Sequence, residues 1–156
     1  MKLANAFGLN DSIRTKTFEY GNHTFKVKIP TTAETEAMYE RIKAVPDDEA
    51  EKRYQEMAKP FFDNRAEYEK DTDVLFTEND VLVKTYSLKE TARNKAMTEN
   101  RIVEMFRLLL PKEAEFDMSQ VTYQDIDEIF PFSVQLEMMD EIATLIAPTY
   151  GETKKK

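Results

Sequence analysis

Two kinds of periodicity divide the chain. Residues 17–20 and 24–29 alternate apolar with polar side chains, which is the spacing of a half-buried β-strand. The segment Gly21-Asn22-His23 between them is typical of a tight turn. The pattern therefore predicts a β-hairpin over residues 17–29. Because an isolated hairpin is only marginally stable, its apolar face must lie against helices or against a strand of another chain; that face consists of Phe18, Tyr20, Phe25, Val27 and Ile29.

After Pro30 the apolar residues recur every three to four positions, as on one face of an α-helix. Cap residues and prolines mark where each helix begins and ends. A first helix is expected after a Thr31/Glu34 capping box and closes at Val45-Pro46. A second helix is expected to be capped by Asp47 or Asp48, with a kink or break at Pro60, and a short exposed helical piece is expected within residues 63–73. A longer helix is expected from Leu88 to Leu110, after a Ser87/Glu90 capping box. A short helix capped by Thr122 is expected to end near Phe130-Pro131, and a last helix to run from Pro131 or Ser133 to Pro148.

Residues 74–84 allow two interpretations. Val74-Leu75-Phe76 and Val81-Leu82-Val83 are short runs rich in β-branched residues, which favour a second small hairpin. The same segment also fits a helix capped at Thr77. We favour a helix over residues 78–84.

These elements predict an α+β fold, mainly α with a small N-terminal β-hairpin, in a single helical domain. Residues 1–16 are aperiodic and are expected to form a flexible arm. Residues 17–148 are expected to form one α-rich domain that contains the hairpin 17–29. Residues 149–156, which end in three lysines, are expected to form a flexible basic tail.

Composition excludes several function classes. The chain has no cysteine, which excludes disulfides, thiolate zinc sites and a cysteine nucleophile, and fits a reducing cytoplasm. A formal charge of −8 disfavours nucleic acid as the main partner, because binding to phosphates needs a basic face. No apolar run approaches the ~20 residues that span a bilayer, so no membrane association is expected. Only three glycines occur, all isolated, so the usual nucleotide-binding loops are absent.

The candidates for catalysis and metal binding are weak. The only histidine, His23, lies in the predicted turn without an orienting partner. Two acidic runs, residues 71–73 and 125–128, resemble the start of a calcium loop. The sixth position of that loop requires glycine, whereas Phe76 and Phe130 occupy it here. The sequence therefore predicts no catalytic, metal-binding or cofactor-binding residue and no enzymatic activity; an enzyme that uses scattered carboxylates with a divalent metal is a less favoured alternative.

The methionines and the last helix point to protein binding instead. Methionine is flexible and polarisable and is over-used on adaptable binding surfaces, and the chain contains eight. The last predicted helix is apolar around most of its circumference, so it is either central in the fold or covered by a partner. The candidate protein-binding residues are Phe130, Phe132, Leu136, Met138 and Met139. The candidate self-association edge, through which a homo-oligomer could form, consists of Phe18, Tyr20, Phe25 and Val27.

The order of the segments carries a family resemblance. It comprises Phe25–Pro30 leading into Thr31–Arg41, then Asp80–Val83, Ser87–Ala92, Asn100–Leu109 and the helix at Phe130-Pro131. Together these resemble the tail assembly chaperones of long-tailed, siphovirus-type bacteriophages, over roughly residues 17–147. The likeness consists of patterns of apolar and charged residues and includes no diagnostic motif.

The resemblance implies a non-enzymatic protein that acts in the cytoplasm of the infected bacterium. Such a chaperone binds the tape-measure protein and helps recruit tail-tube subunits during tail morphogenesis, and it is absent from the finished particle. Two alternatives remain on the residues alone: another phage structural or adaptor protein of the head–tail connector type, and a small bacterial protein-binding adaptor.

Overall fold

The structure, a computed structural model, describes residues 2–9 and 11–148. The chain forms two compact units. Unit 1 comprises residues 1–39 and 101–156, and unit 2 comprises residues 40–100. The boundary between them falls within helix α2 (Thr32–Lys43) and within helix α5 (Leu88–Phe106).

Unit 1 contains a three-stranded antiparallel sheet in the order β1 (Thr15–Tyr20), β2 (His23–Lys28), β6 (Leu109–Leu110). The hairpin predicted for residues 17–29 is therefore confirmed, although it begins two residues earlier. Its two-residue turn is Gly21-Asn22, and both residues have positive φ, as the tight turns of hairpins require. His23 already belongs to β2 and pairs with Tyr20.

Strand β6 was not predicted. The expected helix from Leu88 to Leu110 ends at Phe106, and the chain then adds Leu109-Leu110 to β2. The N–H of Lys28 also donates to the carbonyl of Leu108 at 2.8 Å. Pro111, which has no N–H to donate, follows the strand directly. The chain itself therefore supplies a third strand beside β2.

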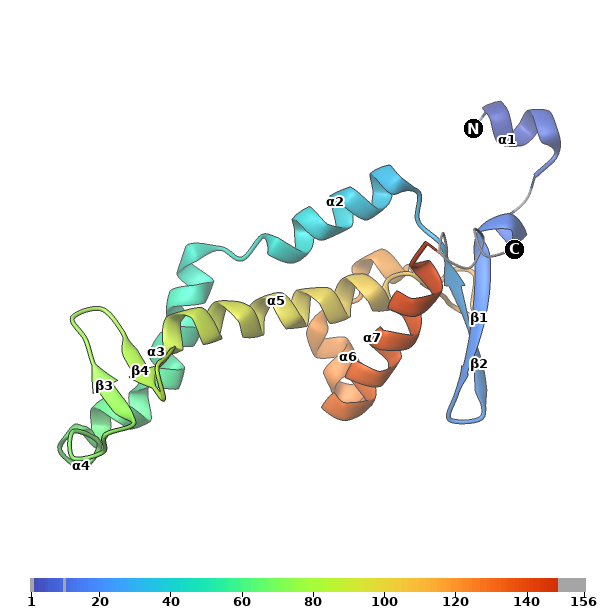
Figure 1. Ribbon diagram of the computed structural model, residues 1–156. Coiled ribbons are helices and arrows are strands. Elements are labelled where there is room, and N and C mark those ends of the chain that lie inside the picture. Colours follow the sequence, from blue (N-terminus) through green and yellow to red (C-terminus); the bar gives the residue numbers. More distant parts are fainter. Residues whose placement is uncertain (1, 10, 149–156) are drawn as a thin grey trace, which may run out of the picture. The chain divides into compact units, whose positions relative to one another are not determined.

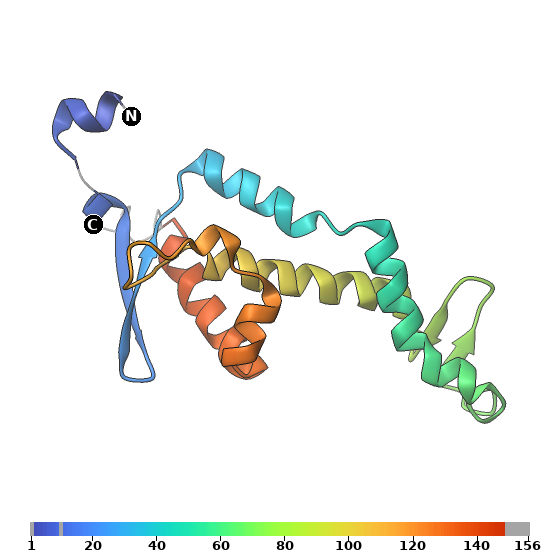
Figure 2. The same cartoon turned by 180° about the vertical axis from the view of Figure 1, so that it is seen from behind.

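Two α-helices, α6 and α7, follow β6 in unit 1. Helix α6 (Tyr123–Ile129) begins with a complete capping box between Thr122 and Asp125. Helix α7 (Phe132–Ile146) begins after the two residues Phe130-Pro131, and it packs against β1. Figures 1 and 2 show α6 and α7 side by side. The described part of this unit also contains α1 (Lys2–Phe7), the first part of α2, the end of α5, and the 3₁₀ turns Asp11–Arg14 and Met118–Gln120.

Unit 2 contains α3 (Asp47–Asp63), α4 (Arg65–Tyr68) and a small antiparallel sheet. The sheet has the order β3 (Val74–Phe76), β4 (Val81–Val83), β5 (Tyr86–Ser87). The core of this unit joins α3, the sheet and the start of α5 through Tyr54, Ala58, Val74, Val81, Leu88 and Ala92. The short exposed helix predicted within residues 63–73 is confirmed as α4.

The favoured helix over residues 78–84 is wrong, because Val81–Val83 is a strand that pairs with Val74–Phe76. Asp80 fixes the corner before that strand. Its carboxylate accepts the Ser87 hydroxyl and the backbone N–H groups of Val81 (2.7 Å) and Lys89 (3.2 Å). Ser87 in turn accepts the N–H of Glu90 at 3.1 Å, as expected of the residue that caps α5. One carboxylate thus organises the strand and the start of the following helix.

Two helix boundaries also differ from the prediction. Pro46, rather than Asp47 or Asp48, is the residue before the first turn of α3, and no side chain caps that helix. The same helix continues through Pro60 to Asp63, so of the expected kink or break at Pro60 the break is wrong, and the kink stays a prediction. The Thr31/Glu34 capping box of α2 is present, with N···O distances of 2.9 and 3.2 Å.

The expected class, α+β, holds, but the single helical domain is wrong. The described residues form two three-stranded sheets, and the chain divides into two units. The segment predicted as a flexible arm, residues 1–16, contains α1 and the turn Asp11–Arg14. The predicted basic tail, residues 149–156, lies outside the described residues.

Candidate protein-binding site

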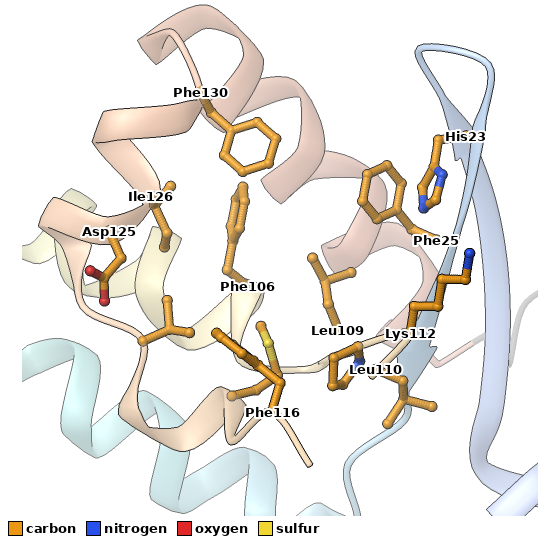
Figure 3. A pocket seen from close by; sticks show the side chains of 13 residues that line it. His23, Phe25, Phe106, Leu109, Leu110, Lys112, Phe116, Asp125, Ile126 and Phe130 are labelled. Atoms are coloured by element: carbon orange, nitrogen blue, oxygen red, sulfur yellow. The ribbon is translucent and has the colours of Figure 1, made fainter. Parts of the chain in front are cut away.

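An apolar pocket of about 290 Å³ lies in unit 1. Figure 3 shows its walls: the rings of Phe106 and Phe130 on the helical side, and those of Phe25 and His23 on the hairpin. The remaining lining residues come from β6, from the segment that follows it and from α6: Leu109, Leu110, Pro111, Lys112, Phe116, Met118, Val121, Asp125 and Ile126.

Several contacts hold these walls in place. The Phe106 and Phe130 rings meet edge to face, with centroids 5.4 Å apart. On the hairpin, Phe25 stacks on Phe18 at 5.3 Å and contacts the edge of His23 at 4.5 Å. Such aromatic pairs prefer these offset and edge-to-face geometries. The pocket is therefore lined by rings that the fold already positions.

The third wall is the loop between β6 and α6, and Arg107 anchors its far end. The guanidinium of Arg107 donates two hydrogen bonds to the carbonyl of Val121, at 3.0 and 2.8 Å. This contact fixes where the loop returns to α6. Within the loop, Phe116 is 54% exposed, and Leu110 of β6 is 37% exposed. A half-exposed phenylalanine beside an apolar pocket is typical of a surface that binds another apolar group.

Charged groups are few in the pocket. Besides His23, its lining includes only Lys112 and Asp125. The Asp125 carboxylate already accepts the backbone N–H of Thr122 at 2.9 Å. Among the described residues, no group of three or more histidine, aspartate or glutamate side chains is placed to hold a metal ion. The chemistry that this lining supports is the burial of apolar side chains.

The structure separates the candidate residues of the last helix. Met138 is fully buried and belongs to the core, whereas Met139 and Leu136 are half-buried. Phe130 is half-buried and lines the pocket, while Phe132 is 52% exposed. The apolar circumference of α7 therefore reflects both a central position in unit 1 and a partly exposed start.

A buried glutamine fixes the corner between α6 and α7. Gln135 is fully buried, and its amide donates to Asp127 at 3.0 Å and to the carbonyl of Phe130 at 2.8 Å. Its oxygen accepts the hydroxyl of Tyr123 at 2.9 Å. Since all of these groups are satisfied, the residue serves the fold and holds Phe130 at the pocket.

The candidate residues of the self-association edge also differ in burial. Phe18 and Val27 are buried, and Tyr20 and Phe25 are half-buried. Strand β2 is the middle strand of its sheet, so Phe25 and Val27 do not lie at an edge, and β1 is the hairpin's only edge strand. The Tyr20 hydroxyl donates to the Glu137 carboxylate of α7, and this hydrogen bond is the main reason why the pKa of Tyr20 lies above its ordinary value of 10.0. Self-association through this edge stays a prediction.

The exposed apolar residues of unit 1 that the sequence did not single out include Leu110 and Phe116 beside the pocket and Ile129, which is 71% exposed. Phe116 had a signal in the sequence, because it stands alone among charged residues in the loop 112–117. Leu110 was assigned to a helix face, so its place beside the pocket could not be foreseen.

Comparisons with known protein families, with curated proteins and with solved structures gave no match to this chain. Within the described part of the chain, no helix has the length and apolar character needed to cross a membrane.

Proposed function

We propose that this chain is a non-enzymatic tail assembly chaperone of a long-tailed bacteriophage. In this role it binds the tape-measure protein in the cytoplasm of the infected cell and helps recruit tail-tube subunits. The observation that carries the binding function is the open apolar pocket of unit 1, with Leu110 and Phe116 exposed beside it. The identity of the client rests on the sequence resemblance over roughly residues 17–147.

The pocket suits a client that presents apolar side chains at intervals, such as an amphipathic helix. Apart from Phe116 in the loop, its rings come from the end of α5, from the residue that caps the C-terminus of α6 and from β2, so they are positioned before a client arrives. Preorganised rings lose little conformational entropy on binding. The net charge of −8 keeps a complex with an apolar client soluble through mutual repulsion between complexes.

Co-expression tests this proposal. The full chain is produced together with the tape-measure protein encoded in the same phage genome, and the soluble fraction of the tape-measure protein is measured. The wild-type chain should raise that fraction, and the double variant Leu110→Ser/Phe116→Ser should abolish most of the effect. The matched control is Leu75→Ser, because Leu75 is an equally exposed apolar residue (59%) of unit 2.

Two results would count against the chaperone. The first is a tape-measure protein that is equally soluble with the wild-type chain and with the pocket variant. The second is the chain itself in purified virions at structural copy number, which a head–tail connector component predicts and an assembly chaperone does not.

A further inference from the structure

One side of α7 carries a row of apolar side chains that the fold leaves partly exposed. The row consists of Phe132, Leu136, Met139 and Ala143. Their spacing of four, three and four residues keeps them on one side of the helix. Phe132 is 52% exposed, and the other three are half-buried. The residues that α7 buries in the core lie about a quarter of a turn away; they are Gln135, Met138 and Ile142.

The shape of this row favours an α-helix as its partner. At 1.5 Å per residue, the row extends about 16 Å along α7. Apolar residues that alternate between spacings of three and four are those that pack into the holes of a second helix in a coiled coil. Two helices packed in this way cross at about 20° and bury both apolar rows. The row therefore fits a helix that carries an apolar row of its own.

The charge around the row favours a basic partner. Residues 113–148 contain no lysine, arginine or histidine, although the chain has 22 lysine and arginine residues. Their carboxylates are Glu113, Glu115, Asp117, Asp125, Asp127, Glu128, Glu137, Asp140 and Glu141. None of these carboxylates forms an ion pair with a described residue. The hydrogen bonds that they accept come from neutral donors, so their negative charge stays uncompensated.

Carboxylates lie on both sides of the row. On one side, Asp140 follows Met139 directly, and its exposed side chain lies less than a quarter of a turn from the middle of the row. On the other side, the amide of Gln135 donates to Asp127 of α6 at 3.0 Å. The next residue of α6, Glu128, is exposed. An apolar row with acidic borders matches a helix whose own borders are lysine and arginine.

We propose that this row binds a basic amphipathic helix of a partner protein. Apolar side chains of that helix pack on the row, and its basic side chains lie beside Asp140 and Glu128. A second copy is a poor occupant, because pairing this surface with itself places carboxylates against carboxylates. None of the four row residues lines the apolar pocket, so the proposal is independent of the client that the pocket binds.

Two synthetic peptides test the proposal. The first is an amphipathic helix of about 21 residues, long enough to be helical in water, with leucine at the apolar positions and lysine at the others. The second has glutamate in place of every lysine. Each peptide carries a fluorophore and is titrated with the full-length chain, and fluorescence anisotropy gives the affinity.

The lysine peptide should bind at least about tenfold more tightly than the glutamate peptide, because only the first matches the acidic borders. Phe132→Ser/Met139→Ser should weaken its binding at least about tenfold, since both apolar contacts are lost. The pocket variant Leu110→Ser/Phe116→Ser should bind it as the wild type does. Equal affinity for the two peptides would overturn the proposal, and so would a loss of binding in the pocket variant alone.

A charge substitution tests the border without touching the apolar row. Asp140→Asn should weaken binding of the lysine peptide about two- to fivefold at low salt, as expected for one exposed ion pair. The matched control is Asp73→Asn, at an exposed position of unit 2, which should leave the affinity unchanged. Equal effects of the two substitutions would contradict a basic helix at this border. Both comparisons stand even where Phe132→Ser/Met139→Ser fails to fold, which circular dichroism detects.

Sedimentation of the wild-type chain tests the other occupant. The chain should show no dimer that depends on Phe132 and Met139. A dimer that Phe132→Ser/Met139→Ser dissociates, while the variant keeps its helical circular dichroism, would assign the row to a second copy and overturn the proposal.

Discussion

The hollow of unit 2 and the pocket of unit 1 are lined by different chemistry. The unit 2 hollow, about 210 Å³, includes Asp47, Glu51, Lys89 and Arg93 among its lining residues. Two of these charged groups have partners within the unit: Arg93 forms an ion pair with Asp47 at 3.0 Å, and the Lys89 ammonium lies 5.2 Å from the centroid of the Tyr54 ring. The unit 1 pocket is lined by aromatic and aliphatic side chains that end in an open space. Our proposal therefore places the client at exposed apolar surface rather than at any hollow in the fold.

The tight turns of the two sheets differ in the residue types that occupy them. Both have two residues at positive φ: Gly21-Asn22 between β1 and β2, and Lys84-Thr85 between β4 and β5. Glycine and asparagine adopt that backbone at little cost, whereas a β-branched threonine does so at a cost of about 1–2 kcal/mol. The first turn therefore supports its hairpin, and the second is held by the structure around it.

The largest expected change in stability comes from α7, where a buried and a half-buried methionine are neighbours. Met138→Glu places a carboxylate where the side chain is fully buried, so the free energy of unfolding should fall by about 3–5 kcal/mol. Met139→Glu, on the half-buried neighbour, should cost much less. Urea unfolding followed by circular dichroism measures both. Equal losses in the two variants would contradict the assignment of Met138 to the core.

Single substitutions in the two turns should change the free energy of unfolding in opposite directions. Gly21→Ala should lower the free energy of unfolding by about 1–2 kcal/mol, because the added methyl meets no atom within 4 Å and the cost is purely that of positive φ. Thr85→Gly should raise it by about 0.5–1 kcal/mol, since glycine relieves the strain at φ +72° but gains freedom when unfolded. The same unfolding assay measures both changes. A stability loss in Thr85→Gly would show that this turn is not strained.

A smaller effect is expected at the capping box of α2 in unit 1. Thr31→Ala removes the hydroxyl that accepts the Glu34 N–H at 3.2 Å, and should cost about 1 kcal/mol. The pKa of the Glu34 carboxyl lies below its ordinary value of 4.5, chiefly because the Thr31 N–H donates to the carboxylate.

The carboxylate of Glu34 therefore contributes stability that is present above pH 4.5 and is lost as the pH falls through its lower folded pKa. The stability difference between the wild type and Glu34→Gln should exist at pH 7 and shrink in that acidic range. Glu36→Gln, at an exposed position of the same helix, is the control. A difference for Glu34→Gln that does not change with pH would contradict the assignment.

The smallest expected effect on stability belongs to the pocket surface. Phe116→Ser should change the free energy of unfolding by less than about 0.5 kcal/mol, because the ring is already half exposed. The same variant should weaken binding of the tape-measure protein. A large loss of stability would show that Phe116 is part of the core rather than a binding residue.

Local signals in the sequence were sufficient for the first hairpin and for most helices. The Gly21-Asn22 turn and the alternation around it predict β1 and β2, and the capping residues Thr31, Ser87 and Thr122 mark the starts of three helices. These features are decided by neighbouring residues, so a single sequence contains them.

Features decided at long range could not be foreseen. Leu109-Leu110 continues the apolar stripe of α5, and only its pairing with Lys26-Val27, more than eighty residues earlier, makes it a strand. In unit 2, the run Val81–Val83 on its own also fits a helix, and its pairing with Val74–Phe76 makes it a strand. The pocket depends on such long-range features, because β6 and the loop that Arg107 anchors form two of its walls. Among the protein-binding candidates, Phe130 lines the pocket.

Amide hydrogen exchange of the full chain, alone and with the tape-measure protein, tests most directly whether unit 1 holds the binding surface. Binding should slow exchange in residues 106–130 and in β2, whose side chains line the pocket, and should leave α3 and the hollow of unit 2 unchanged. Slowing that is confined to residues 40–100, or that is absent from residues 106–130 in a complex shown to form, would contradict the assignment of the apolar pocket as the client site.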